Sequence, residues 1–297
     1  MIKNLVFYNH WQNGDIHVSR EFIKLIINNV KAENYIYVHN KSKELLKDIP
    51  NLKISNECIE YLDNDSPRMW NLHTRTLCLN TWYGVSSSFK DTSSCTINTL
   101  FDLFNDHIKY ITNTGYIDPS NIRKLVPKVD YSKHYIKNIE EYVKRSNSKK
   151  ILICNGSVVS KQSKNFSFEN IVEEIAMSYP SVDFILTEKF KTIIKNIKFT
   201  SDIIGKNNTD LNEIGFLSTF CDVIVGRSSG PYIYSMVKEN LFNEKKTFLC
   251  FSDDEEIAYW SDDKAFFSCK TMWSNDYRKE NIIEKIIESM GDNNEQT

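Results

Sequence analysis

A carboxylate lies directly after the first apolar run of the chain. The stretch Asn13–His17 contains Gly14-Asp15 and follows the run Leu5–Tyr8, and an amphipathic segment comes next. Ligands of open α/β sheets bind outside the carboxyl ends of the strands. Asp15 is therefore either a helix cap or a general base that faces a bound substrate. His17 either orients a ligand and polarises Asp15 or is an ordinary residue of the first helical turn.

A second cluster, Gly226–Pro231, has the composition of an anion site. The apolar run before it ends in Gly226, and Pro231 is a typical first residue of a helix. Ser228 and Ser229 can donate to phosphate oxygens, Gly230 lets the backbone approach, and Arg227 adds a bidentate charge. The alternative is a plain strand–turn–helix junction with serine caps.

A third polar cluster, Asn155-Gly156-Ser157, also follows an apolar run. Lys161 comes shortly after it and is the better candidate for a phosphate contact, and Lys164 is the second candidate. Backbone amides and a lysine in such a loop can hold a diphosphate. The alternative is a polar loop whose lysines are simply solvated.

Weaker signals surround the apolar run at Thr76–Leu79. Arg68, His73, Arg75 and Trp82 flank it, and they can bind an anionic or sugar acceptor, the aromatic ring by stacking. The alternative is the polar side of an edge strand with a core or rim aromatic. The acidic run Asp253–Glu256 fits no calcium or magnesium motif, so we expect a solvated loop and neither a metal nor a cofactor.

Composition restricts the class of protein. The 297 residues are 41% apolar and 26% charged, which is typical of folded proteins of one or two domains. A net charge of −2 argues against nucleic-acid binding through bulk electrostatics. There is no apolar run of about 18 residues and no signal peptide pattern. The seven scattered cysteines form no CxxC pair, so we expect a cytoplasmic protein, with peripheral membrane contact left open.

Apolar runs and amphipathic segments alternate along the chain, which predicts parallel sheets with right-handed crossovers. We expect strands at Leu5–Tyr8, Tyr35–Val38, Leu52–Ile54, Thr76–Leu79, Ile151–Cys154, Val182–Leu186, Ser201–Ile204, Val223–Val225 and Phe248–Phe251. We expect helices at Ser19–Val30, Ser42–Leu46, Ile97–Ile111, Tyr131–Val143, Phe168–Ser178, Asn212–Phe220, Pro231–Lys238 and Glu280–Met290.

A basic, serine-containing stretch at 144–150 separates two such alternations. It predicts two Rossmann-like domains facing across a cleft, at 1–147 and 148–277.

Together these pieces resemble a GT-B glycosyltransferase, in particular the ADP-heptose:lipopolysaccharide heptosyltransferase family. Gly14-Asp15-Ile16-His17 is similar to that family's Gly-Asp and histidine after the first strand. Cys154–Ser157 with Lys161 is similar to the opening of its second domain, and Ser228–Pro231 to its later Asp-[Ser/Thr]-Gly-Pro loop, with serine in place of aspartate.

The resemblance implies a metal-independent, inverting transfer of a hexosyl or heptosyl group from a nucleotide sugar to a glycan or lipid-linked saccharide. Asp15 would be the catalytic base, and Lys161 would contact the donor diphosphate. The resemblance also implies that the first domain is the acceptor-side domain, that the second binds a nucleotide sugar, and that the terminal segment 278–297 packs back on the first. Three alternatives stay open: another GT-B enzyme such as a sugar-nucleotide epimerase, a binding or scaffold protein that has lost catalysis, and a DNA glycosyltransferase.

Overall fold

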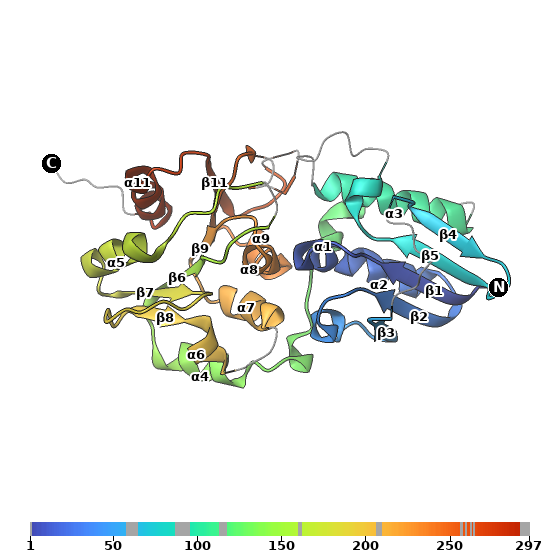
Figure 1. The fold of residues 1–297 in the computed structure, drawn as a ribbon, viewed down its shortest axis with the longest axis horizontal. Helices are drawn as coiled ribbons and strands as arrows, with labels where there is room; N and C mark the ends of the chain where they lie inside the picture. Colours follow the sequence, from blue (N-terminus) through green and yellow to red (C-terminus); the bar gives the residue numbers. More distant parts are fainter. Residues whose placement is uncertain are drawn as a thin grey trace. The chain divides into compact units, whose positions relative to one another are not determined.

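The computed structural model describes residues 2–57, 65–86, 96–112, 118–159, 162–205, 210–255, 258, 260, 261, 263 and 265–291. The chain forms two compact units (Figure 1). The first contains Met1–Lys133 and Trp260–Asp262, and the second contains His134–Tyr259 and Asp263–Thr297.

The described part of the first unit builds a five-stranded sheet in the order β3-β2-β1-β5-β4. Its strands are β1 (Ile2–Tyr8), β2 (Ala32–Val38), β3 (Leu52–Ser55), β4 (Arg68–Asn71) and β5 (Thr76–Asn80). Its helical segments are α1 (Asn13–Val18), α2 (Arg20–Asn29), η1 (Lys43–Leu46), η2 (Tyr83–Val85), α3 (Ile97–Thr112), η3 (Pro119–Leu125) and η4 (Tyr131–Lys133). All pairings are parallel except β4 with β5, a hairpin at the sheet edge that the sequence did not predict.

The described part of the second unit builds a six-stranded parallel sheet in the order β11-β10-β9-β6-β7-β8. Its strands are β6 (Lys149–Cys154), β7 (Val182–Leu186), β8 (Ile197–Phe199), β9 (Val223–Gly226), β10 (Thr247–Phe251) and β11 (Lys270–Ser274). Its helices are α4 (Lys137–Arg145), α5 (Glu169–Ser178), α6 (Thr200–Ile204), α7 (Leu211–Ser218), α8 (Gly230–Tyr234), α9 (Lys238–Leu241) and α11 (Lys279–Ser289).

Burial explains why the central strands of the second unit read as continuous apolar runs. Helices cover a parallel sheet on both faces, so successive residues of a strand are buried whichever way they point. Ile151–Cys154 and Thr247–Phe251 are buried at every position. Helices α5 and α11 pack side by side against the sheet, and Val172 and Ile286 belong to the resulting core (Figure 1).

Three expected elements differ in the structure. Residues 201–204 lie in helix α6, not in a strand, because a short apolar run does not distinguish the two. The helix expected over Tyr131–Val143 is interrupted, since Asp130 caps a short turn by accepting from the Ser132 amide and α4 begins only at Lys137. The helix expected over Pro231–Lys238 divides into α8 and α9.

The division between the units also differs from the expected boundary. It falls between Lys133 and His134, so α4 belongs to the second unit. Asn138 donates to the carbonyl of Ile204, and the Tyr142 hydroxyl donates to Asp183. The basic stretch at 144–150 is therefore the entry to β6 and not a linker. Helix α11 packs on α5 and β10 of its own unit, which corrects the expectation that it crosses to the first domain.

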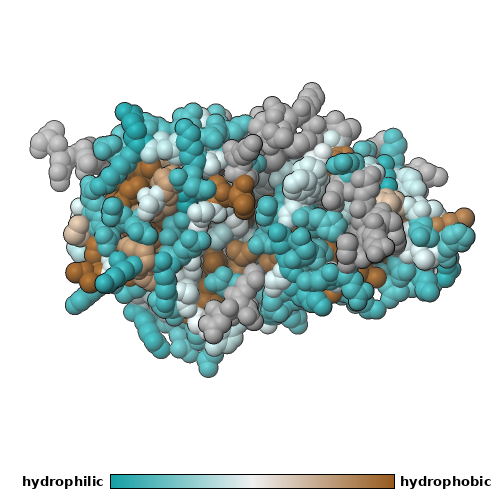
Figure 2. All heavy atoms as spheres, viewed as in Figure 1, coloured by the Kyte–Doolittle hydropathy of each residue, from teal (hydrophilic) through white to brown (hydrophobic). Residues whose placement is uncertain are grey.

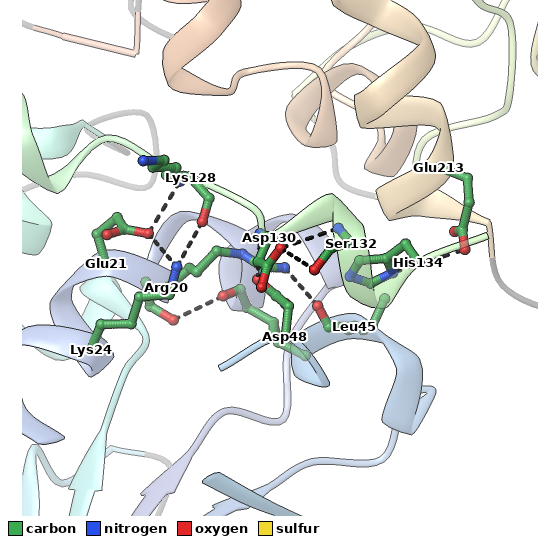
Figure 3. Close-up of polar contacts among 12 residues, drawn as sticks. Arg20, Glu21, Lys24, Leu45, Asp48, Lys128, Asp130, Ser132, His134 and Glu213 are labelled. Carbon is green, nitrogen blue, oxygen red and sulfur yellow. Dashed lines mark hydrogen bonds and ion pairs between the residues drawn. The ribbon is translucent and has the colours of Figure 1, made fainter. Parts of the chain in front are cut away.

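A buried ion pair connects helix α2 to the last segment of the first unit, around residues 128–130 (Figure 3). Arg20 and Asp48 have fully buried side chains that form a salt bridge, and Arg20 also donates to the Leu45 carbonyl over 2.6 Å. Asp48 accepts from the Asp130 amide over 3.1 Å. Lys128 is held in the same way, because its amide donates to Glu21 over 3.2 Å.

We expect Asp48→Asn to lower the free energy of unfolding by about 2–3 kcal/mol, because it leaves the Arg20 charge buried without its counter-ion. Equilibrium urea denaturation measures the change. The control is Glu44→Gln, which removes a partner of Lys47 at a solvent-exposed pair and should change stability by less than about 0.5 kcal/mol. Equal losses in the two variants would contradict the role of the buried pair.

Candidate functional site

Each sheet has a point where its strand order reverses, and ligands of open α/β sheets bind at the carboxyl edge at such points. In the first unit this point lies between β1 and β5, and in the second between β6 and β9. The residues directly after these strands are therefore the first place to look for a site in each unit.

Asp15 lies in α1, which follows β1. Gln12 donates its amide proton to Asp15 Oδ2 over 2.9 Å, and the Gln12 side chain accepts in return from the Asp15 amide. The Tyr83 hydroxyl, which follows β5, donates to the same carboxylate. Asp15 therefore takes part in capping α1 from the third position of the helix, with Gln12 and not Asp15 as the N-cap residue, while its role as a base stays a prediction. The two roles are compatible, since a carboxylate accepts several hydrogen bonds.

Burial raises the pKa of Asp15 above its ordinary value. Hydrogen bonds from Tyr83 and Gln12 and the charge of Lys41 act in the opposite direction without cancelling the effect. The side chain is only half-buried, so it can still be reached. A carboxylate with a raised pKa is a stronger base than an ordinary aspartate.

Two histidines lie after the neighbouring strands β1 and β2. Burial lowers the pKa of His10, and burial together with the charges of His10 and Lys41 lowers the pKa of His39 to about 4. Both rings are therefore neutral at pH 7. His39 Nδ1 accepts from the Lys41 amide over 2.9 Å, so the ring proton lies on Nε2.

Buried donors near these strand ends have capacity for a ligand. His39 Nε2 and Asn9 Nδ2 are buried, and neither has a hydrogen-bond partner among the residues that the structure describes. Buried polar groups are nearly always satisfied in folded proteins, so such donors mark a place where a bound molecule can supply the acceptor. None of Asn9, His10, His39 and Lys41 was predicted from the sequence as a site residue.

The other residues predicted for the first unit do not all come together. His17 is fully buried, so it is a core residue and not one that contacts a substrate. Trp82 follows β5 at the carboxyl edge, and Arg68 pairs with Leu79 close to the same end. His73 and Arg75 lie in the turn between β4 and β5, at the opposite end of the sheet.

Arg75 shows this most clearly. Its carbonyl accepts from the Lys3 amide over 2.9 Å at the start of β1, and its side chain forms an exposed ion pair with Glu33. The expectation that Arg75 and His73 share an acceptor site with Trp82 is corrected by this topology.

In the second unit, Asn155 joins the ends of β6 and β7. Its Oδ1 accepts from the Glu188 amide over 2.8 Å and from Thr187 Oγ1 over 3.2 Å, while its Nδ2 donates to the Glu188 carbonyl over 3.0 Å. Both the oxygen and the nitrogen of the Asn155 side chain are bonded to protein atoms, so Asn155 shapes the loop, and its contact with a donor stays a prediction.

Arg227 joins the ends of β6 and β9. It is 1% exposed and donates to the carbonyls of Phe166, Asn155 and Gly156 over 2.8, 2.6 and 2.8 Å. Its guanidinium group also lies 4.9 Å from the ring centre of Phe166 and 5.2 Å from that of Phe168. These three contacts of Arg227 hold the backbone of the loop, while its Nε has no hydrogen-bond partner among the described residues. A direct contact of Arg227 with phosphate therefore stays a prediction.

The serines of the two loops differ in exposure. Ser157 is exposed, Ser228 is half-buried and Ser229 is buried. Ser229 Oγ has no hydrogen-bond partner among the described residues, so a bound anion can accept from it. A Cβ at Gly230 would meet only Leu211, at 3.6 Å, so no protein atom requires glycine there. Lys161 lies outside the described residues.

Comparison with solved structures identifies the fold. A glycosyltransferase of family 9 from Veillonella parvula aligns with a TM-score of 0.51 at 9% identity, over 98% of this chain and 89% of that one. Escherichia coli heptosyltransferase WaaC with ADP aligns with a TM-score of 0.52 at 7% identity, over 96% and 99%. WaaC with ADP-2-deoxy-2-fluoro heptose aligns with a TM-score of 0.51 at 8% identity, over 97% and 99%. The fold is that of the GT-B glycosyltransferases. No protein-family model and no curated protein matches the sequence.

The GT-B assignment confirms the predicted resemblance at the level of fold. It also accounts for the presence of two sheets, one parallel throughout and one parallel except at its edge strand β4. Among the residues that the structure describes, no three His, Cys, Asp or Glu side chains are grouped to hold a metal ion. Within the same residues, no helix combines the length and apolarity of a membrane span.

The loop Gly226–Gly230 also matches the Gly-x-Ser-x-Gly pattern of α/β-hydrolases, with Ser228 at the position of the nucleophile. That nucleophile lies on a sharp, strained turn. The described non-glycine residues with positive φ are Asn51, Arg75 and Trp260, so Ser228 shows no strain of that kind. The backbone geometry therefore gives no support to Ser228 as a nucleophile of this type.

Proposed function

We propose that this protein transfers a sugar from a nucleotide-sugar donor to a hydroxyl group of a saccharide acceptor, with Asp15 as the general base. The observation that carries the proposal is the half-buried Asp15 carboxylate. It lies beside the switch point of the first sheet, with a raised pKa and hydrogen bonds from Gln12 and Tyr83. The GT-B fold supports the same class of reaction, since the matched structures include one with ADP.

Each unit would hold one substrate. The donor diphosphate would bind at the second switch point, where Ser157, Ser228 and Ser229 offer hydroxyl groups. Arg227 would act there as a positioning residue that holds the loop. Lys161 stays the predicted diphosphate contact.

The chemistry at Asp15 follows from its position and charge. The carboxylate would take the proton of an acceptor hydroxyl as that oxygen forms a bond to the anomeric carbon. The bond from the anomeric carbon to the diphosphate oxygen would break, and the nucleoside diphosphate would leave with the electron pair. Because one base and one displacement suffice, we infer inversion at the anomeric carbon.

Metal independence is part of the proposal and needs its own control. Asp63-Asn64-Asp65 has the spacing of a paired-carboxylate motif, and residues 63 and 64 lie outside the described ranges. Assays are therefore run with EDTA and again with Mg²⁺ or Mn²⁺. Activity that needs the added cation would overturn this part of the proposal alone.

A thermal-shift titration tests the donor site. We expect one nucleotide among ADP, UDP, GDP and CDP to raise the melting temperature in EDTA. At a hundredfold excess over Kd, binding should raise the free energy of unfolding by about 2.7 kcal/mol. The matching nucleotide sugar should stabilise as well. The control is inorganic pyrophosphate, which lacks the base. If no nucleotide stabilises the protein, or pyrophosphate does so equally, the proposed donor site is wrong.

A further inference from the structure

The same three-residue pattern, Asn-x-Trp, occurs where the chain leaves β1 and where it leaves β5. Asn9 precedes Trp11 by two residues, and Asn80 precedes Trp82 in the same way. In both turns the asparagine Oδ1 accepts from the tryptophan amide, over 2.9 Å for Trp11 and 3.0 Å for Trp82. Since β1 and β5 are adjacent parallel strands with Tyr8 paired to Asn80, the two turns lie next to each other.

The two indole rings stack on each other, with centroids 4.5 Å apart and planes 28° from parallel. Trp82 is half-buried and also lies against the backbone of Gly84, where an added Cβ would come within 2.2 Å of its ring. Trp11 is 43% exposed. Trp82 therefore supports the stack, and Trp11 is the ring that is presented to solvent.

The stack is tied to Asp15 on both sides. Gln12, the residue after Trp11, donates its amide proton to Asp15 Oδ2 over 2.9 Å. Tyr83, the residue after Trp82, donates its hydroxyl proton to the same carboxylate. The aromatic pair and the carboxylate are thus held by one set of hydrogen bonds at the carboxyl edge of the sheet.

We propose that the exposed indole of Trp11 is a stacking platform for the pyranose ring of the acceptor. The apolar C–H face of the sugar would lie on the ring, and one of its hydroxyl groups would face Asp15. Ligand sites combine aromatic surface with a few convergent polar groups in this way. This inference rests on the proposed function and adds the acceptor class, a pyranoside whose apolar face is open. The stacking on an acceptor sugar that the sequence predicted for Trp82 is thereby assigned to Trp11.

Binding is measured on the full chain labelled with ¹⁵N-tryptophan, which gives one indole signal for each of its five tryptophans. The probes are the methyl pyranosides of glucose, galactose, mannose and N-acetylglucosamine at millimolar concentration, with adenosine and uridine as rival stacking ligands. We expect at least one pyranoside to shift the Trp11 and Trp82 signals saturably. The Trp70 signal should stay unmoved, although Trp70 is also 43% exposed.

Three variants sharpen the result. Trp11→Ala should weaken pyranoside binding by about tenfold, while Trp70→Ala should leave it within about twofold of the wild-type value. Gly84→Ala removes no aromatic ring but displaces Trp82, so it should weaken binding as Trp11→Ala does. Heat denaturation of each variant confirms folding.

The platform is overturned if no pyranoside shifts Trp11 more than Trp70, if a nucleoside shifts Trp11 more strongly than every pyranoside, or if binding survives in Trp11→Ala. Its failure is distinguishable from failure of the proposed function. Nucleotide stabilisation without a pyranoside response removes the platform alone. A pyranoside response without nucleotide stabilisation removes the proposed transfer and leaves a saccharide-binding site.

Discussion

Asp15→Asn lowers kcat/KM for sugar transfer by about 10³-fold, because an amide cannot take a proton from the acceptor hydroxyl. Asparagine can still accept from the Gln12 amide, so the cap of α1 is retained. The measurement is the rate of nucleoside diphosphate release with saturating acceptor. The control is Asp118→Asn, which changes an exposed turn cap that accepts from Ser120 and should keep full activity.

Stability separates loss of chemistry from loss of fold. The raised pKa of Asp15 means that the folded state favours the neutral acid. Its contribution to stability is present below the ordinary aspartate pKa and is lost as the pH rises through the folded value. Asp15→Asn should therefore be at least as stable as the wild type at pH 7. An inactive variant that is also less stable would contradict this account.

The pH profile follows from the same shift. The base must be ionised to act, so kcat/KM should fall as the pH decreases through the raised pKa of Asp15.

Arg227→Met lowers the free energy of unfolding by about 3–5 kcal/mol, because three carbonyls, one in a buried and two in partly buried hydrogen bonds, lose a charged donor at once. Those carbonyls belong to Phe166, Asn155 and Gly156. The thioether chain still fills space beside the rings of Phe166 and Phe168, so the loss is one of hydrogen bonds more than of volume. Equilibrium denaturation in urea measures it.

A matched variant on the surface provides the control. Arg278 is 79% exposed and bonds only to nearby Asp276 in its ion pair, so Arg278→Met should cost less than about 0.5 kcal/mol. If Arg227→Met instead keeps full stability and loses much of its nucleotide affinity, Arg227 is a direct phosphate ligand.

The sequence predicted those features that depend on apolar burial and on the order of the elements along the chain. Apolar runs predicted most of the strands, since strands of a covered parallel sheet are buried on both faces. The position of Asp15 after β1 needed only the order of elements. The edge strands β4, β8 and β11 were missed, because Arg68–Asn71, Ile197–Phe199 and Lys270–Ser274 are only partly buried and carry no continuous apolar run.

Side-chain direction is what the sequence could not supply. Arg227 has the composition of a phosphate ligand, but its direction toward three backbone carbonyls depends on how β6 and β9 pair. His17 and Asp15 are two positions apart in α1, and this spacing places one inside the unit and the other at its surface. The repeated Asn-x-Trp pattern at Asn9 and Asn80 is present in the sequence, but only the structure shows that the two turns lie side by side.

The most direct test of the account is ³¹P and ¹H NMR of the protein with a panel of nucleotide sugars and the pyranoside acceptors, in EDTA, for the wild type and Asp15→Asn. We predict that one nucleotide sugar is converted to its nucleoside diphosphate with a glycoside of inverted anomeric configuration, and that Asp15→Asn stops the conversion. Conversion at an undiminished rate in Asp15→Asn would contradict the role of this carboxylate, and absence of any nucleoside diphosphate with the wild type would contradict glycosyl transfer itself.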